Sequence, residues 1–275
     1  MDEQGWIING GNSPILYHMA EACAMSIKQN SDRPVCIAVD KQDKWPKEYD
    51  SADYIVEYPF GDTATGTTLP QLNQWQLYHC TPFEHSIIVE ADGLLTSNID
   101  SVWRATAQQN IALGRSVVNF RGNNPTIKQR QHWSKADLPN VFAGMWSIKQ
   151  SDEGLAYAKM LDIVCQHWRE VAKLQLPPEH IPDSPNADLL HSITCKLMDD
   201  DHTLLNDALE YTFIPDEDDK KWNFYLNFWY YNGVVKVDNF RQHGFFKYVE
   251  TDVITNEIFD GIRSNTRSRS HNSAT

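Results

Sequence analysis

The chain has 275 residues, a hydrophobic fraction of 41% and a formal net charge of −13. This length allows one large α/β domain or two small ones, with enough apolar residues for a core. The acidic balance argues against a protein whose whole surface follows a nucleic-acid backbone, although it leaves room for a local basic patch. It is also compatible with an acidic pocket that recruits a divalent cation before an anionic ligand.

The sequence gives no sign of membrane insertion, secretion or disulfide bonding. No segment approaches the ~18 apolar residues that cross a bilayer. The acidic start Met1–Gln4 does not resemble a secretory signal. The five cysteines are odd in number and include no Cys-x-x-Cys pair, which makes a zinc site or disulfide framework a poor explanation. We therefore expect a cytoplasmic protein with reduced thiols.

The first part of the chain alternates strand and helix patterns. Ser13 followed by Pro14 is typical of a helix N-cap and first helical position. The alternation favours a parallel or mixed α/β sheet. The predicted strands cover residues 6–9, 35–40, 54–58 and 86–90, and the predicted helices cover 15–29 and 69–80.

Beyond residue 120 the regular alternation ends. Residues 121–135 are polar and irregular, and we expect a loop over the site. Helices are predicted at 155–174 and 188–198, with a proline-rich loop between them, and 222–237 is aromatic and rich in β-formers. We expect residues 1–262 to form one domain and 263–275, rich in Ser, Asn and Arg, to be a disordered tail.

The most informative segment is the apolar, β-branched run 86–90, which ends in Glu90-Ala91-Asp92. It predicts a strand buried on both faces, with its carboxylates at the edge where open α/β sheets bind ligands. Glu90 and Asp92 leave the strand on the same face. Two carboxylates there suit Mg²⁺ or Mn²⁺. A simple turn is the alternative, because Asp and Gly both favour turns.

The first two predicted strands also end in polar residues, Asn9-Gly10-Gly11 and Asp40. The glycines do not form Gly-x-Gly-x-x-Gly, and no P-loop lysine follows, so dinucleotide-fold and P-loop interpretations lose their main support. A loop here could receive a nucleotide base and ribose. A tight turn explains the glycines equally well.

Several segments in order resemble the GT-A nucleotide-sugar glycosyltransferases, especially the glycogenin and bacterial galactosyltransferase-like branch. Glu90-Ala91-Asp92 followed by Asn98-Ile99-Asp100 and Trp103 resembles the family's Asp-x-Asp strand and the stretch after it. Residues 185–190 resemble its Asp-Gln-Asp-x-Leu-Asn helix start. Residues 243–248 resemble its His-x-Gly-x-x-Lys-Pro-Trp segment, with one residue fewer and no Pro-Trp. The resemblance covers roughly residues 6 to 250.

The resemblance implies a GT-A, Rossmann-like mixed sheet with flanking helices. It implies a metal held by Asp92, His243 and Glu90, and Lys247 on the diphosphate. It implies that Asn140 and Gly144 line the sugar pocket and that Asp188 acts with Asn140 and Lys247 in catalysis. From the residues alone, Asn140 also suits a turn after Pro139, and Asp188 a helix cap. The full set expected to contact the donor is Asn9, Gly10, Gly11, Asp40, Glu90, Ala91, Asp92, Gly144, Gly244 and Lys247.

The function that this combination predicts is a metal-dependent glycosyltransferase, with Mn²⁺ or Mg²⁺ as cofactor and a nucleotide-diphosphate sugar, UDP-sugar foremost, as donor. The acceptor could be a glycan, a protein or a nucleic acid. Basic residues between 115 and 135 suit an anionic acceptor, although a mobile lid is the simpler explanation of that segment. Two alternatives stay open: a non-catalytic nucleotide-sugar-binding protein and a nucleotidyltransferase.

Overall fold

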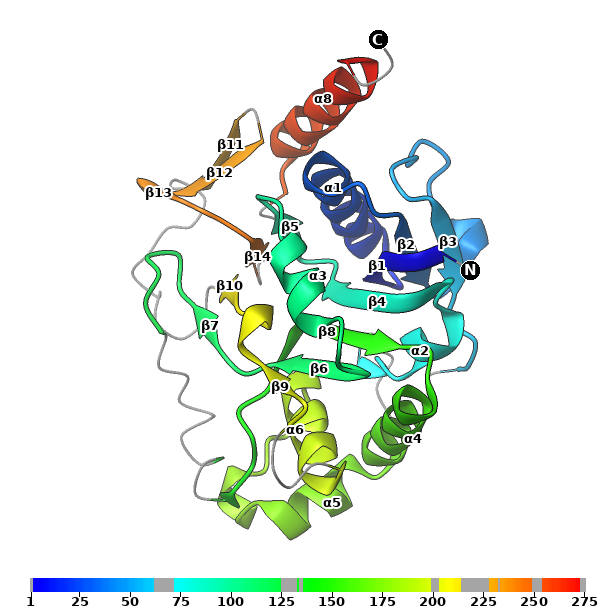
Figure 1. Ribbon diagram of the computed structural model, residues 1–275, viewed down its shortest axis with the longest axis vertical. Helices are drawn as coiled ribbons and strands as arrows, with labels where there is room; N and C mark the ends of the chain where they lie inside the picture. Colours follow the sequence, from blue (N-terminus) through cyan, green and yellow to red (C-terminus); the bar gives the residue numbers. More distant parts are fainter. Residues whose placement is uncertain are drawn as a thin grey trace.

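A computed structural model of the chain describes residues 2–61, 72–124, 133, 136–198, 203–213, 228–231, 233–248 and 254–272. Its largest sheet has seven strands in the order β3-β2-β1-β4-β8-β6-β9 (Figure 1). These strands are β1 (Asp2–Gly11), β2 (Val35–Val39), β3 (Tyr54–Glu57), β4 (Phe83–Glu90), β6 (Ile111–Gly114), β8 (Phe142–Lys149) and β9 (Leu205–Asn206).

The sheet is mixed. Strands β3, β2, β1 and β4 run parallel to one another, whereas β8 runs antiparallel to both β4 and β6. Ile7 pairs with Ile88, and Ile8 pairs with Ile37, so the three central strands lie side by side in close register. The structure confirms the predicted mixed α/β sheet. It also confirms that the segments after β1, β2 and β4 leave the sheet at one edge.

Two smaller sheets extend this edge. The first has the order β5-β14-β10-β7, and the second has the order β11-β12-β13. Their strands are β5 (Gly93–Leu95), β7 (Val117–Val118), β10 (Tyr211–Phe213), β11 (Phe228–Tyr231), β12 (Val234–Val237), β13 (Phe240–Arg241) and β14 (Phe245–Lys247). Strand β14 brings the C-terminal part of the chain back to the segment that follows β4.

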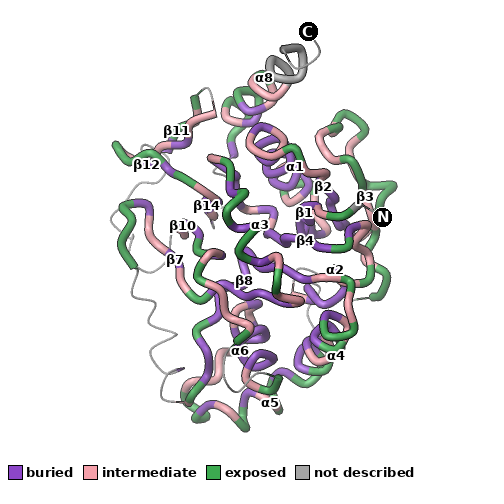
Figure 2. The backbone as a smooth tube through the Cα atoms, viewed as in Figure 1, coloured by how far each residue is buried: buried purple, intermediate pink, exposed green. Residues whose placement is uncertain are grey.

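Helices cover both faces of the large sheet (Figure 1). The helices are α1 (Pro14–Asn30), α2 (Gln76–Cys80), α3 (Asp100–Thr106), α4 (Asp152–Gln166), α5 (Trp168–Gln175), α6 (Ala187–Met198) and α8 (Asn256–Asn272), with short 3-10 helices at Gln42–Lys44, Pro178–His180 and Asp207–Leu209. Alternate strand residues supply two cores: Ile8 and Ile37 pack in the core that includes α1, and Ile7 and Ile88 pack in the core that includes α4 and α6. The buried residues of Figure 2 accordingly concentrate along the central strands and the inner faces of the helices.

Most of the predicted helices are present, but several of them begin or end at other residues than predicted. Helix α1 begins as predicted, because Ser13 accepts a hydrogen bond from the backbone N–H of Leu16 and Pro14 opens the first turn. The single helix predicted over 155–174 is two helices that meet at His167. The helix predicted over 69–80 is described only from residue 72 and is helical from Gln76.

The tail predicted to be disordered after residue 262 is helical as far as Asn272, in α8. Its polar composition gives this helix few apolar residues to bury, and contacts with α1 stabilise it. The amide of Gln29, on α1, donates to the carbonyl of Ile262 (2.9 Å) and to Oγ1 of Thr266 (2.7 Å). Phe259 and Ile262 are buried in the core beside α1. The sequence pattern of α8 alone could not predict these partners.

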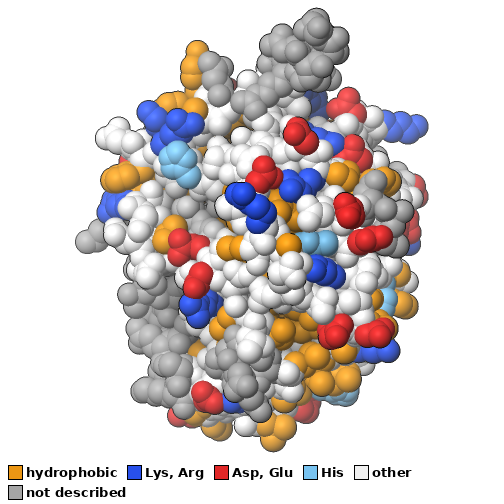
Figure 3. Space-filling view, in the orientation of Figure 1, with side chains coloured by type: hydrophobic (Ala, Val, Ile, Leu, Met, Phe, Trp, Pro, Cys, Tyr) orange, Lys and Arg blue, Asp and Glu red, His pale blue; other side chains and the backbone are white. Residues whose placement is uncertain are grey.

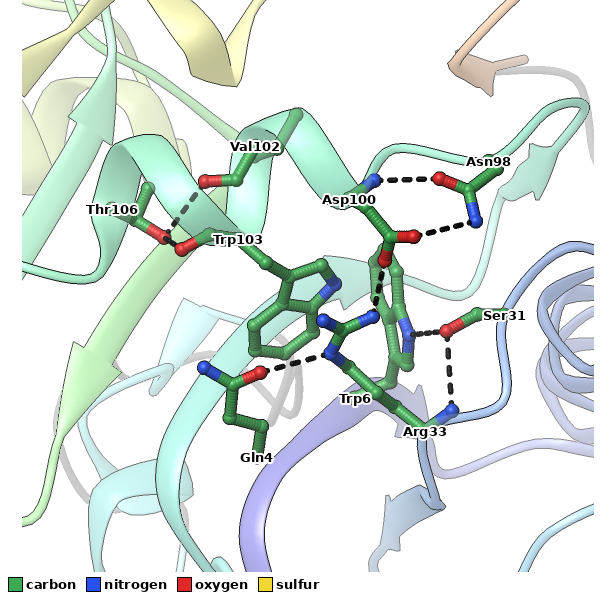
Figure 4. A network of polar contacts seen from close by, with 9 residues as sticks. All are labelled: Gln4, Trp6, Ser31, Arg33, Asn98, Asp100, Val102, Trp103 and Thr106. Carbon is green, nitrogen blue, oxygen red and sulfur yellow. Dashed lines mark hydrogen bonds and ion pairs between the residues drawn. The ribbon is translucent and has the colours of Figure 1, made fainter.

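The opposite edge of the sheet is closed by a polar network around Arg33 (Figure 4). Its guanidinium donates to Gln4 (3.0 Å) and Asp100 (2.5 Å) and lies 4.7 Å from the ring centroid of Trp103. Trp103 meets Trp6 edge to face at 5.4 Å. The network ties β1, the end of α1 and α3 together at the amino ends of the strands, away from Glu90. Within the described residues, no helix has the length and apolar character needed to cross a bilayer.

Candidate functional site

The candidate site lies where β1, β2 and β4 end. Asn9 pairs with Glu90 on one side and with Ala38 on the other. Gly10 and Gly11 are the last residues of β1, and Gly11 has a φ of 76° where the pairing with β2 becomes irregular. The register therefore brings Asn9, Asp40, Glu90 and Asp92 to one sheet edge. This is the arrangement predicted from the order of the strands.

The centre of the site is an ammonium group between two carboxylates. Lys247 Nζ donates to Oδ2 of Asp92 at 2.5 Å and forms a second ion pair with Oε2 of Glu90. The side chains are mostly buried, with exposed fractions of 12% for Lys247, 22% for Glu90 and 19% for Asp92. Part of each side chain of the cluster is therefore exposed.

Strand pairing determines which residue reaches the carboxylates. β14 runs antiparallel to β5, and Lys247 pairs with Gly93 directly after Asp92. The backbone N–H of Tyr248 then donates to the carbonyl of Asp92 at 2.8 Å. Gly93 permits this approach, because a Cβ atom there would lie 2.1 Å from the ring of Phe245. A larger residue here would force the ring of Phe245 to move.

The charged groups of the cluster change one another's pKa. Burial raises the pKa of Glu90, Lys247 counteracts this, and the charges of Asp92 and Asp188 raise it further. Burial alone would lower the pKa of Lys247, but Asp92 and Glu90 outweigh it and raise that pKa, so the lysine stays protonated. With both carboxylates ionised, Glu90 and Asp92 against the one ammonium of Lys247 carry one net negative charge. Such a site attracts a further cation.

The start of β8 forms the neighbouring wall. The backbone N–H of Ala143 donates to Oδ1 of Asp188 at 2.7 Å, which ties the start of α6 to this strand. The N–H of Gly144 donates to the hydroxyl of Tyr211 at 3.2 Å. A Cβ atom on Gly144 would lie 2.5 Å from that hydroxyl and 3.0 Å from Cδ of Lys247. Gly144 thus allows Tyr211 and Lys247 to pack against β8.

The ends of β1 and β2 carry a second polar group. The hydroxyl of Tyr58 donates to Oδ1 of Asn9 and lies 3.3 Å from the N–H of Gly11. Asp40 accepts from Tyr17 and, at 2.8 Å, from Lys44. Partial burial would raise the pKa of Asp40, but these hydrogen bonds outweigh it and lower the pKa.

Gln74 lies behind Glu90 and is a site residue that the sequence reasoning missed. Its amide nitrogen is 3.2 Å from Oε1 of Glu90, and its amide oxygen lies close to Trp146 and His191. Gln74 is only 1% exposed. A buried glutamine in a polar stretch has no local sequence signal, so only the fold identifies it.

Three predicted site residues are not brought to the carboxylates. His243 is exposed and lies beyond the contact of Gly244 with Ser97, at the far end of the β5–β14 pair. Gly244 bonds to Thr96 and Ser97, which lie beyond the end of β5, whereas Lys247 pairs with Gly93 at its start. The prediction that His243 approaches Asp92 is therefore wrong, and Gly244 shares its displacement. Asn140 is exposed and donates to the carbonyl of Arg115 at 3.2 Å.

The basic segment suggested for the acceptor is only partly described. Arg115 pairs with Asp207, and Arg121 lies 4.8 Å from the ring centroid of Phe120. Lys128, Arg130 and Lys135 lie outside the described residues. On the face drawn in Figure 3, acidic and basic side chains are interspersed, without a basic stripe.

A divalent cation fits part of this site. Among the described residues, Oδ1 of Asp92 is buried and has no hydrogen-bond partner, and Lys247 links Asp92 to Glu90. Carboxylate oxygens are the ligands that Mg²⁺ and Mn²⁺ prefer. Across the described ranges, however, no three His, Cys, Asp or Glu side chains lie together as a complete ligand set. Glu90 and Asp92 could hold a cation only with ligands from elsewhere, such as a diphosphate.

No family model and no curated protein sequence matches the chain. Solved structures with a similar fold include the glycosyltransferase GlyE of Streptococcus pneumoniae TIGR4, at 8% identity and a TM-score of 0.39, covering 77% of this chain and 46% of that one. Mouse xyloside xylosyltransferase 1, apo form, matches at 8% identity and a TM-score of 0.46, covering 75% of this chain and 84% of that one. The apo form of GlyE matches at 9% identity and a TM-score of 0.40, covering 73% of this chain and 44% of that one. The chain thus spans less than half of the GlyE chains that it matches. At these values the activity has to be inferred from the site.

Proposed function

We propose that this protein is a metal-dependent glycosyltransferase that uses a nucleotide-diphosphate sugar, with a UDP-sugar as the donor to test first. The observation that carries the proposal is the cluster of Glu90, Asp92 and Lys247 at the carboxyl ends of parallel strands. Ligands of open α/β sheets bind at this edge. An ammonium and a partly satisfied carboxylate pair suit a diphosphate and its divalent cation.

Each residue has a separate role in the proposal. Glu90 and Asp92 would hold Mn²⁺ or Mg²⁺, which supplies electrostatic stabilisation of the leaving diphosphate. Lys247 provides a second positive charge that can turn from the carboxylates toward the phosphate oxygens. The polar group of Asn9, Tyr58 and Gly11 would contact the nucleoside. Asp188 positions Ala143 and Gly144, which form the wall beside the sugar.

The decisive experiment measures donor binding and turnover separately. Calorimetry with UDP-sugars and UDP, with and without Mn²⁺, should show binding that needs the metal. Asp92→Asn should abolish metal-dependent binding. Asp100→Asn is a matched control, because Asp100 lies in the Arg33 network at the opposite edge of the sheet. Equal donor affinity in Asp92→Asn and the wild-type protein would contradict the proposal.

One observation favours a second candidate. Lys247 fills the space between the two carboxylates, and no histidine joins them in the part of the chain that is described. A non-catalytic protein could hold a nucleotide sugar with Lys247 alone. Binding that is independent of Mn²⁺, together with no release of nucleoside diphosphate, would select this candidate. Release of pyrophosphate would instead select a nucleotidyltransferase.

A further inference from the structure

A chain of buried hydrogen bonds runs from the core that includes α4 and α6 to the carboxylate of Glu90. It passes through Tyr157, His191 and Gln74, and Trp146 joins it at Gln74. These four residues come from α4, α6, β8 and the segment before α2, and each is at most 1% exposed. Buried polar groups of this kind are expected to satisfy one another completely.

The direction of every bond in the chain is determined by the indole. Trp146 Nε1 is only a donor, so the Gln74 atom that it meets at 2.8 Å is the amide oxygen. His191 Nε2, 3.1 Å from the same oxygen, must then carry a proton. Its Nδ1 is left to accept from the hydroxyl of Tyr157 at 2.9 Å. Burial lowers the pKa of His191 to about 3, which keeps the ring neutral, as this pattern requires.

The consequence for Gln74 is that its NH₂ group has one orientation. The amide oxygen accepts from two N–H donors. If the amide flipped, its NH₂ group would face these two donors and both hydrogen bonds would be lost. The NH₂ group therefore faces Oε1 of Glu90 at 3.2 Å, while Lys247 holds Oε2. The carboxylate is thereby held at both oxygens from opposite sides.

We propose that Gln74 is the positioning residue of Glu90, and that the chain from Tyr157 through His191 exists to fix its amide. The proposal rests on the proposed function, because the role of Glu90 there is to hold the divalent cation. Partners that orient metal ligands typically change metal affinity 10- to 100-fold when they are removed. Gln74 acts on the cation only through Glu90.

The test is Mn²⁺ binding in the presence of saturating UDP, followed by the EPR signal of free Mn²⁺ during a titration, with the same UDP solution without protein as the blank. Gln74→Met should bind Mn²⁺ roughly 10- to 100-fold more weakly than the wild-type protein. Trp146→Phe removes the donor that fixes the amide, so it should also weaken Mn²⁺ binding, by a smaller factor than Gln74→Met. Thr194→Val is the matched control: it removes a buried hydrogen bond of α6, from Thr194 Oγ1 to the carbonyl of Leu190, and should leave Mn²⁺ affinity as in the wild-type protein. Gln74→Asn, which keeps an amide but is too short to span the same partners, should weaken binding in the same way and serves if Gln74→Met does not fold.

Two results overturn the inference while leaving the proposed function intact. One is wild-type affinity in a folded Gln74→Met or Gln74→Asn variant. The other is an equal loss in Thr194→Val, because a general loss of core packing would then explain both variants. A wild-type protein that binds no Mn²⁺ in the presence of UDP would instead remove the metal from the proposed function, and this inference with it.

Discussion

Lys247 is the counter-charge of Glu90 and Asp92 in the structure, and we propose that it also contacts the diphosphate of the donor. A lysine that pointed to water would affect neither binding nor folding. This lysine is 12% exposed and sits between two carboxylates. Removing its charge therefore changes stability as well as chemistry.

Lys247→Met should lower the free energy of unfolding by about 2–4 kcal/mol, since two partly buried carboxylates lose their partner. It should also reduce turnover roughly 30- to 1,000-fold while weakening donor binding much less. Added Mn²⁺ should restore more stability to the variant than to the wild-type protein. Urea unfolding with and without Mn²⁺ measures this, with Lys196→Met, whose partner Asp137 lies elsewhere, as the control. Equal Mn²⁺ effects on all three proteins would contradict the expectation.

Gly144→Ala tests the close contact at the start of β8. The new methyl group would meet the hydroxyl of Tyr211 and the stem of Lys247. We expect a loss of about 1–3 kcal/mol of stability, as for other overpacked sites, together with weaker donor binding. Gly61→Ala is the matched control, because no atom of the described residues lies within 4 Å of a Cβ at that position. If the two variants behave alike in calorimetry and urea unfolding, the packing assigned to Gly144 is wrong.

His85 predicts an acid sensitivity that has nothing to do with the site. It is buried in β4 against Trp103, and burial, with Lys149 and Arg33 nearby, lowers its pKa from 6.5 to about 4. The unfolded chain therefore binds more protons than the folded protein between these values. Above pH 6.5 the titration of His85 barely affects the free energy of unfolding. As the pH drops toward 4, the unfolded chain takes up a proton that the folded protein does not, and the free energy of unfolding falls. Between pH 7 and pH 5 the loss should be about 2 kcal/mol.

His85→Phe should remove that loss, because phenylalanine can fill the apolar space beside Trp103 without a titrating group. The measurement is urea unfolding of both proteins at pH 7 and pH 5. His191 titrates similarly in both, so the difference between the proteins isolates His85. Parallel pH dependence in the two proteins would show that His85 is not responsible.

At the level of elements, the contact between α1 and α8 can be tested separately from the site. Gln29→Met should remove the amide group that now bonds both the carbonyl of Ile262 and the hydroxyl of Tyr230. Amide hydrogen exchange across residues 256–266 should therefore rise, while the strands β1 and β4 keep their protection. Asn30→Ala is the neighbouring control: its amide contacts Ser26 and Leu95 and does not touch α8. Unchanged exchange in α8 would mean that apolar packing alone holds the helix.

The sequence predicts elements well where the pattern is local. The β-branched runs give β2 and β4, and Ser13-Pro14 gives the start of α1. Features that depend on pairing between distant segments are different. The place of His243 follows from the register of β14 on β5, which no local pattern encodes. Helix α8 contacts Gln29 of α1, and the role proposed for Gln74 depends on an indole and an imidazole from two other elements.

For the whole molecule, the sheet follows from local patterns, whereas the site depends on pairing between distant segments. Parallel central strands and their common carboxyl edge follow from the alternation of strand and helix. Glu90, Asp92, Gly144, Asp188 and Lys247 were all identified by sequence and do lie around one centre. His243, Gly244 and Asn140 do not join it. A linear motif predicts which residue types a site uses more reliably than it predicts which of them meet.

The contact of Gln29 with Ile262 also has a consequence for how the protein is made. The two residues are 233 positions apart in the chain. At a synthesis rate of ~5–20 residues per second, α1 leaves the ribosome roughly 10 to 50 s before its partner helix exists. During that interval the part of α1 that α8 will cover, including buried residues such as Gln29, has to be shielded by something other than native structure. Nascent chains halted between residues 200 and 250 should therefore be bound by cellular chaperones more strongly than the released protein.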